Sequence, residues 1–168
     1  MIRGYAPADF AAVLAVVNDA AEAYRGAIPA DRWHEPYMPA DELSAEIAAG
    51  VAFRLWAEDG DVVGVMGGQS VRDVFLIRHA YVRTARRRQG IGAVLLADLI
   101  ARIDRPVLIG TWAAATWAVR FYQKHGFRLV TPVEKDRLLR TYWTVPPRQI
   151  ATSVVLADAR WFARAKET

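Results

Sequence analysis

Cysteine is absent from the 168 residues of the chain, and histidine occurs only three times. A chain without cysteine can form no disulfide, no thiolate metal site and no cysteine nucleophile. The three histidines, His34, His79 and His125, show no paired spacing of the kind that holds zinc. We therefore predict that the protein has no metal site.

Long hydrophobic runs are missing as well. No apolar run approaches the roughly 18–20 residues that a membrane-spanning helix needs, and residues 1–5 lack the apolar stretch of a secretory signal. We expect a cytoplasmic protein with no membrane partner. The chain is 54% hydrophobic and 24% charged, which is typical of a globular protein. Its length matches one domain of about 100–200 residues, so the sequence predicts a single domain over residues 1–168.

Positive charge is concentrated in one segment. Lys and Arg number 22 and Asp and Glu 18, a difference of +4, and four arginines lie together at positions 83, 86, 87 and 88. A local excess suits a phosphate-bearing cofactor better than a nucleic-acid duplex. A nucleic-acid-binding module is the alternative, because arginines and aromatic rings can grip phosphates and bases. The aromatic residues are dispersed along the chain, and we therefore predict no nucleic-acid partner.

Hydrophobic periodicity indicates a mixed α/β sheet. A spacing near 3.6 predicts helices over residues 10–17, 41–49, 92–103 and 116–125, with Asp9 as a cap for the first. Apolar and β-branched runs predict strands over residues 51–57, 62–69, 74–82, 107–112 and 127–130. The polar turn at 58–61 makes a hairpin of the first two strands. The strand-helix-strand order over 74–112 indicates a parallel crossover that follows an antiparallel meander.

One further strand is expected near the C-terminus, at residues 153–156, within the stretch 148–156. As an edge strand it would offer unpaired backbone groups to a second subunit and form a homodimer. The same residues could equally fold back on their own sheet. The sequence leaves both interpretations open.

A glycine-containing turn lies between a predicted strand and a predicted helix, where backbone N–H groups at a helix start can hold phosphate oxygens. Its residues are Arg87, Arg88, Gln89, Gly90, Ile91 and Gly92. A tight turn beside a solvated arginine face is the structural alternative. A dinucleotide-binding motif would need a small residue where Leu95 stands, and a nucleotide-binding P-loop would need Gly-Lys-Ser/Thr.

This turn resembles the motif Arg/Gln-x-x-Gly-x-Gly/Ala of the GNAT superfamily of N-acetyltransferases, matched here by Arg87, Gly90 and Gly92. A second family signature is matched by Tyr122 and, at the end of the same helix, Gly126 with Phe127. The resemblance implies a GNAT-like mixed central sheet with helices on both faces and an acyltransferase that uses acetyl-CoA. It implies cofactor contacts at the turn and at Tyr81, Val82 and Thr116.

Two departures from the family pattern concern the site. Ala115 stands where many members have a cofactor-binding Asn, so Thr116 is our replacement candidate. The strand at 74–82 contains no carboxylate, although many members carry a catalytic Glu there. These departures keep a non-catalytic acyl-CoA sensor of the same fold as an alternative function.

The resemblance also implies direct attack of an amine on the acetyl thioester. His79 is the best-placed base, because its reference pKa of ~6.5 suits proton transfer near neutral pH, although a structural histidine is an equal alternative. By resemblance, Tyr122 hydrogen-bonds the departing thiolate and a backbone N–H near Val82 polarises the carbonyl. In the alternative for Tyr122, its ring packs in the core.

An aromatic loop with carboxylates is our candidate for the acceptor site. Trp33, Glu35 and Tyr37 could hold a small cationic amine through ring faces and charge together. In the competing interpretation the two rings pack in the core and the carboxylates face water. We expect a small-molecule primary amine as the partner.

Overall fold

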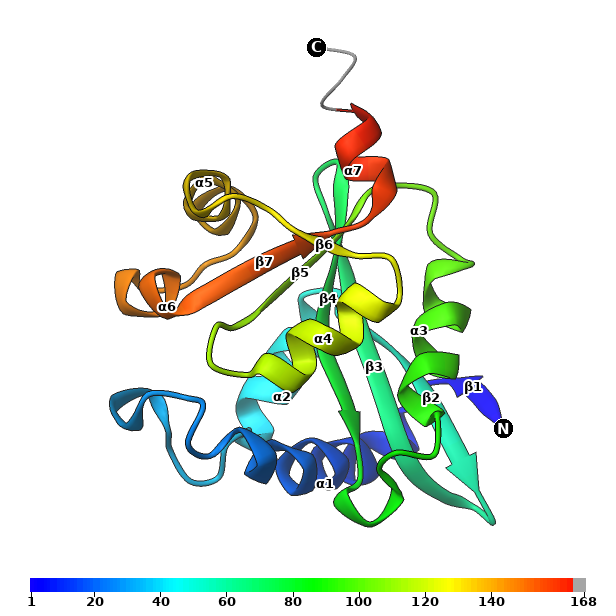
Figure 1. Ribbon diagram of the computed structural model, residues 1–168. Coiled ribbons are helices and arrows are strands. Elements are labelled where there is room, and N and C mark those ends of the chain that lie inside the picture. The colour runs from blue at the N-terminus through cyan, green and yellow to red at the C-terminus, as the bar shows by residue number, and fades with distance from the viewer. Residues whose placement is uncertain (165–168) are drawn as a thin grey trace. The chain divides into compact units, whose positions relative to one another are not determined.

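The computed structural model describes residues 1–164. Within them, seven strands form one mixed sheet in the order β1-β2-β3-β4-β5-β7-β6 (Figure 1). The strands are β1 (Ile2–Gly4), β2 (Ala52–Glu58), β3 (Asp61–Val71), β4 (Val74–Val82), β5 (Val107–Trp112), β6 (Arg128–Leu129) and β7 (Ser153–Ala157). The α-helices are α1 (Phe10–Ala21), α2 (Ala40–Ala48), α3 (Ile91–Ile100), α4 (Thr116–Lys124), α5 (Pro132–Tyr142), α6 (Pro147–Thr152) and α7 (Ala159–Arg164). The predicted mixed α/β class is confirmed.

The chain divides into two compact units. Among the described residues, the first contains residues 1–25, 32–69 and 77–103, and the second contains residues 26–31, 70–76 and 104–164. The prediction of a single domain stays a prediction. None of the helices within residues 1–164 combines the length and hydrophobicity that a membrane span requires.

The first unit is built on an antiparallel meander. β2 pairs with β3 from Ala52 opposite Gly68 to Glu58 opposite Asp61, and β1 adds to the other edge of β2. Asp59 and Gly60, which join β2 to β3, have φ values of 50° and 90°. Two positive φ values are what a tight hairpin turn between twisted strands requires, so the predicted hairpin is confirmed.

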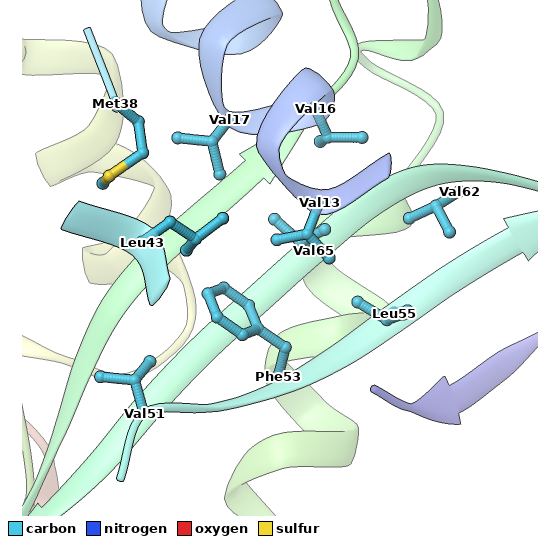
Figure 2. Packing of buried hydrophobic residues seen from close by; sticks show 10 residues of the cluster. All are labelled: Val13, Val16, Val17, Met38, Leu43, Val51, Phe53, Leu55, Val62 and Val65. Atoms are coloured by element: carbon cyan, nitrogen blue, oxygen red, sulfur yellow. The ribbon is translucent and has the colours of Figure 1, made fainter. Parts of the chain in front are cut away.

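One face of this meander carries a hydrophobic core, and Figure 2 shows the ring of Phe53 in the middle of it. The cluster consists of Val13, Val16, Val17, Met38, Leu43, Val51, Phe53, Leu55, Val62 and Val65. Helices α1 and α2 supply Val13 and Leu43, both fully buried. Burial of such side chains contributes about 1.5–3 kcal/mol each, which fixes both helices on this face.

Helix α3 packs against β3 at Gly64. A Cβ on Gly64 would lie 2.8 Å from Cγ2 of Ile91 and 3.2 Å from Cδ1 of Leu95. The missing side chain therefore lets the first turn of α3 approach the strand closely. The helix ends at Ile100, so Ile103, which the sequence pattern included, lies beyond it.

In the second unit, β7 lies between β5 and β6. It pairs antiparallel with β5, from Leu108 opposite Ala157 to Trp112 opposite Ser153, and with β6 on its other side. Of the two interpretations of residues 148–156, the fold back on the chain's own sheet is confirmed for residues 153–156 and the unpaired edge strand is wrong, because both sides of β7 are paired within the chain. Residues 148–152 belong to α6. Helices α5, α6 and α7, which periodicity did not predict, belong to the same unit.

Asp9 does not cap α1 as predicted, because it is itself in helical conformation with no side-chain bond to that helix. Its carboxylate instead accepts hydrogen bonds from Arg3 Nη1 at 2.7 Å, Arg3 Nη2 at 2.8 Å and the backbone N–H of Ala6 at 2.8 Å. These contacts tie β1 to the 3₁₀ turn Pro7–Asp9. Asp9 thus anchors the N-terminus rather than the helix start.

The Arg3 and Ala6 hydrogen bonds lower the pKa of Asp9 to about 2. A depressed folded pKa means that Asp9 stabilises the fold above the unfolded pKa of ~3.9 and loses that contribution as pH falls towards 2. We therefore expect Asp9→Asn to melt below the parent at neutral pH, with the gap closing between about pH 4 and pH 2. Asp104→Asn, at an exposed site, is the control. A gap that stays constant with pH would show that Asp9 acts through packing alone.

Candidate active site

The glycine turn ends in an open helix start. Arg88 and Gly90 have φ values of 62° and 80°, and Gly90 precedes α3 with no side-chain cap on the helix. The first bond of the helix is from Val94 N–H to Gly90 O, at 3.1 Å. The N–H groups of the first turn have no acceptor inside the helix, so they are available to an anion.

The strand end that leads into this turn is anchored at several points. The N–H of Arg83 donates to Val63 O at 2.8 Å, and its Nε donates to Val62 O at 3.1 Å. The N–H of Thr84 donates to the Asp19 carboxylate on α1 at 2.7 Å. These bonds fix where the turn leaves β4.

The four clustered arginines divide into two pairs. Arg83 is used by the backbone of β3, and Arg86 forms an ion pair with Glu58. Arg87 and Arg88 are exposed, and their side chains have no ion pair or hydrogen bond within residues 1–164. The two cations nearest the open helix start are therefore the ones that remain for a ligand.

His79 lies on β4 with 8% of its surface exposed. Its Nε2 is hydrogen-bonded to the carboxylate of Glu46, which comes from α2. The imidazole stacks against the ring of Phe53, with 5.8 Å between the ring centres and 20° between the ring planes. It also stacks against the ring of Tyr81, with a distance of 6.3 Å and an angle of 28°. A buried polar ring with a charged partner and two aromatic neighbours is held in one orientation.

The pKa of Glu46 is lowered overall. Burial is the largest single effect and raises this pKa, but the hydrogen bond from His79 and the charges of His79 and Arg78 together outweigh it. Arg78 Nη2 lies 3.6 Å from Glu46 Oε1. Glu46 is therefore an ionised carboxylate at neutral pH. It is the acidic group that the strand sequence lacks, and it reaches β4 from another element.

Phe53 reaches His79 because Gly67 has no side chain. Gly67 on β3 is the register partner of Phe53 on β2, and β3 lies between β2 and β4. A Cβ on Gly67 would lie 2.6 Å from Cε1 of Phe53. The ring therefore lies across the position where any other residue would project.

The aromatic loop continues the cluster around His79. Tyr37 Oη lies 3.4 Å from Tyr81 Oη, and the Trp33 ring lies 5.5 Å from the Tyr37 ring. The side chain of Asn18 on α1 fixes this loop by pairing with both the N–H and the carbonyl of Met38, at 2.8 and 3.0 Å. Trp33 and Tyr37 are thus brought together with the His79 cluster, while their role in acceptor binding stays a prediction.

Glu35 is engaged differently. Its carboxylate pairs with Arg25 and accepts a hydrogen bond from Trp33 Nε1 at 2.9 Å. The guanidinium of Arg25 lies 4.5 Å from the centre of the Trp33 ring. These contacts lower the pKa of Glu35, with the Trp33 hydrogen bond as the largest cause. The cation site predicted from sequence is occupied by a cation of the chain itself, and an acceptor would have to displace Arg25 to use it.

Tyr122 and Thr116 belong to the second unit, on α4. Tyr122 is 6% exposed and meets Phe121 at 5.1 Å and Phe127 at 6.0 Å, both edge to face. Thr116 is exposed at the first position of the helix. The predicted roles of both residues stay predictions, as do those of Tyr81 and Val82 at the end of β4. Residues 1–164 contain no cluster of three or more metal-ligating side chains.

Comparison with known proteins points in one direction. The family model described as an acetyltransferase (GNAT) domain matches residues 16–141. No curated protein matches the sequence. The fold is similar to the PaiA N-acetyltransferase of Thermoplasma acidophilum in complex with coenzyme A, with TM-score 0.71, 14% identity, and coverage of 94% of this chain and 97% of that one.

Two further solved structures have similar folds. A ribosomal-protein-alanine N-acetyltransferase from Brucella melitensis has TM-score 0.65 at 21% identity, covering 94% of this chain and 98% of that one. A GNAT family acetyltransferase from Elizabethkingia anophelis with acetyl-CoA bound has TM-score 0.60 at 19% identity, covering 94% and 96%. At these identities the likeness concerns the fold.

The contact between Phe53 and Gly67 predicts the effect of one added methyl group. We expect Gly67→Ala to move the Phe53 ring away from His79 and to destabilise the protein by roughly 1–3 kcal/mol, the usual range for overpacking. Proton NMR of the His79 ring would then lose the shift that the stacked Phe53 ring causes. Gly4→Ala is the control, because its Cβ would make an ordinary 3.5 Å contact with Arg54. Unchanged His79 resonances and melting in Gly67→Ala would show that Phe53 does not position the imidazole.

Proposed function

The chain belongs to the acetyltransferase (GNAT) family, and from that premise we propose that it transfers the acetyl group of acetyl-CoA directly to the primary amine of a small molecule. The observation that carries this proposal is the open start of α3, with Gly90 at φ 80° and two arginines that have no partner within residues 1–164. Backbone N–H groups, the positive helix end and flanking guanidiniums form a site suited to a pyrophosphate. Acetyl-CoA is the donor that carries one.

The acceptor must lose a proton before it can attack. An alkylamine with a pKa of ~10.4 is neutral in only about one molecule in 10³ at pH 7. His79, held by Glu46 and two rings, is the group we assign to take that proton. A neutral amine then has the lone pair that the reaction requires.

The acetyl group moves from sulfur to nitrogen. The amine nitrogen forms a bond to the acetyl carbonyl carbon, and the carbon–sulfur bond breaks with its electron pair on sulfur. The second proton of the nitrogen goes to the sulfur, so that the products are an amide and a thiol. A backbone N–H near Val82 is proposed to polarise the carbonyl while charge develops on its oxygen.

Tyr122 is proposed to hydrogen-bond the departing thiolate. Full proton transfer from a phenol of pKa ~10 to a thiolate of pKa ~8.5 would be uphill by about 2 kcal/mol. A hydrogen bond to the developing charge stabilises the transition state without that transfer. This role needs only that the hydroxyl be presented to the sulfur.

The donor half of the proposal predicts a ligand-induced rise in melting temperature. Acetyl-CoA at about 100 times its Kd adds about 2.7 kcal/mol, which for a chain of this size raises the Tm by roughly 5–11 °C. Gly92→Val should remove the rise, because a bulky side chain at the helix start blocks close approach of phosphate oxygens. Ala97→Val, at an exposed position of the same helix, controls for the cost of a β-branched residue.

Thiol release completes the test. Parent protein with acetyl-CoA should release thiol in the presence of at least one amine from a panel of small amines and one alanine-terminated peptide. Binding of acetyl-CoA without thiol release from any acceptor would indicate the non-catalytic sensor. If acetylation were confined to the peptide, the acceptor would be a protein N-terminus instead of a small molecule. A folded Gly92→Val variant that still binds as tightly as the parent would place the donor site elsewhere.

A further inference from the structure

We propose that Glu46 is the positioning residue that keeps Nδ1 of His79 free of hydrogen, so that Nδ1 is the atom that takes the acceptor's proton. The inference rests on the proposed function for its catalytic meaning, but the contact between the two side chains stands by itself. Glu46 touches His79 and would not touch the acceptor's reacting atoms. Its effect on the reaction would therefore pass through the imidazole.

The hydrogen bond determines the tautomer. An ionised carboxylate only accepts hydrogen bonds, and a neutral imidazole carries one N–H. Since Nε2 of His79 is the atom bonded to Glu46, the hydrogen must be on Nε2. The lone pair is then on Nδ1, at another corner of the ring from the carboxylate.

The surrounding rings preserve that assignment. Phe53 and Tyr81 lie nearly parallel to the imidazole, with interplanar angles of 20° and 28°. A ring flip would break the bond to Glu46 and leave a partly buried carboxylate oxygen without its donor, at a cost of about 1–3 kcal/mol. The stacking thus limits the ring to the plane in which Nε2 faces Glu46.

A negative charge lies in direct contact with the imidazole. Glu46 on α2 contributes the negative charge beside the ring. Arg78 on β4 offsets part of that charge, because its Nη2 lies 3.6 Å from Oε1 of Glu46. The other titratable neighbours, Tyr81 and Tyr37, bear phenols, and burial raises the pKa of Tyr37. A phenol whose pKa is raised stays neutral at pH 7, so Tyr37 carries no charge, and neither does Phe53 from β2. An imidazolium formed at His79 is therefore stabilised by one carboxylate.

The proton step is balanced within the pair. One N–H bond of the acceptor ammonium breaks, an Nδ1–H bond forms, and the positive charge moves from the amine to the imidazole. Glu46 keeps its charge and its hydrogen bond throughout. After acetyl transfer, the imidazolium returns its proton to solvent and the original tautomer is restored.

Nitrogen-15 NMR of the histidine rings tests the tautomer directly, with His79→Gln used to assign the His79 signals among the three histidines. At a pH where the His79 ring is neutral, the parent spectrum should show hydrogen on Nε2 and none on Nδ1. Glu46→Gln should give a mixture of tautomers, because an amide can either accept from or donate to Nε2. A parent spectrum with hydrogen on Nδ1 would overturn the proposal.

Turnover at neutral pH tests the same inference, with kcat and KM measured separately. Glu46→Gln should lose about 10-fold to 100-fold in kcat/KM, part of the roughly 10²–10⁴-fold that general base catalysis supplies. The loss should fall on kcat, because Glu46 acts through the imidazole and does not bind the acceptor. Glu42→Gln, an exposed carboxylate one turn earlier on the same helix, should leave both kcat and KM unchanged.

The two proposals fail in distinguishable ways. If the parent acetylates no amine or peptide, the proposed function is wrong, and the tautomer seen by NMR still decides whether Glu46 positions the ring. If the parent is active and Glu46→Gln keeps the parent's kcat, the positioning role is wrong while the acetyltransferase activity stands. Melting curves of each variant show that the comparison is made between folded proteins.

Discussion

The imidazole of His79 is a polar group on a nearly buried face of a sheet, and the first unit is arranged around satisfying it. An unpaired buried donor costs about 1–3 kcal/mol, so the carboxylate of Glu46 on α2 must lie against β4. The ring faces are covered by Tyr81 from the same strand and by Phe53 from β2. Phe53 can reach across β3 because position 67 is a glycine. Helix α2, strands β2 and β4 and the glycine of β3 thus all contribute to enclosing one imidazole.

Helix α1 connects this centre to the glycine turn through two adjacent side chains. Asn18 pairs with both backbone groups of Met38 and so fixes the loop that carries Tyr37, while Asp19 accepts the N–H of Thr84 at the start of the turn. Val16 and Val17, which precede them, are fully buried in the core. Both residues belong to one packed helix. The aromatic loop and the segment that leads into the glycine turn are therefore held by the same rigid element. Side chains held this way need little reorganisation if a ligand binds to them.

The local patterns of the sequence predicted most elements, and tertiary contacts account for what they missed. Periodicity identified the meander, α3 and the strand β5, because these depend on alternation within one segment. It found the strand that is β7 but left open whether this strand lies at an edge or folds back on its own sheet, since pairing on both sides depends on distant strands. Glu46 was missed because its contact with His79 also joins distant segments. The available signal was a carboxylate three positions after Leu43, on the inward side of α2. The pairing of Glu35 with Arg25 is likewise invisible to spacing.

We propose that His79 removes a proton that the acceptor amine cannot lose unaided at neutral pH. This role is tested by kcat/KM of parent and His79→Gln from about pH 7 to about pH 10, with an alkylamine acceptor of pKa ~10.4. The variant should show a large deficit at neutral pH that shrinks towards the upper end, where the amine loses its proton without help. A deficit of equal size at every pH, or none at all, would show that His79 is not the base.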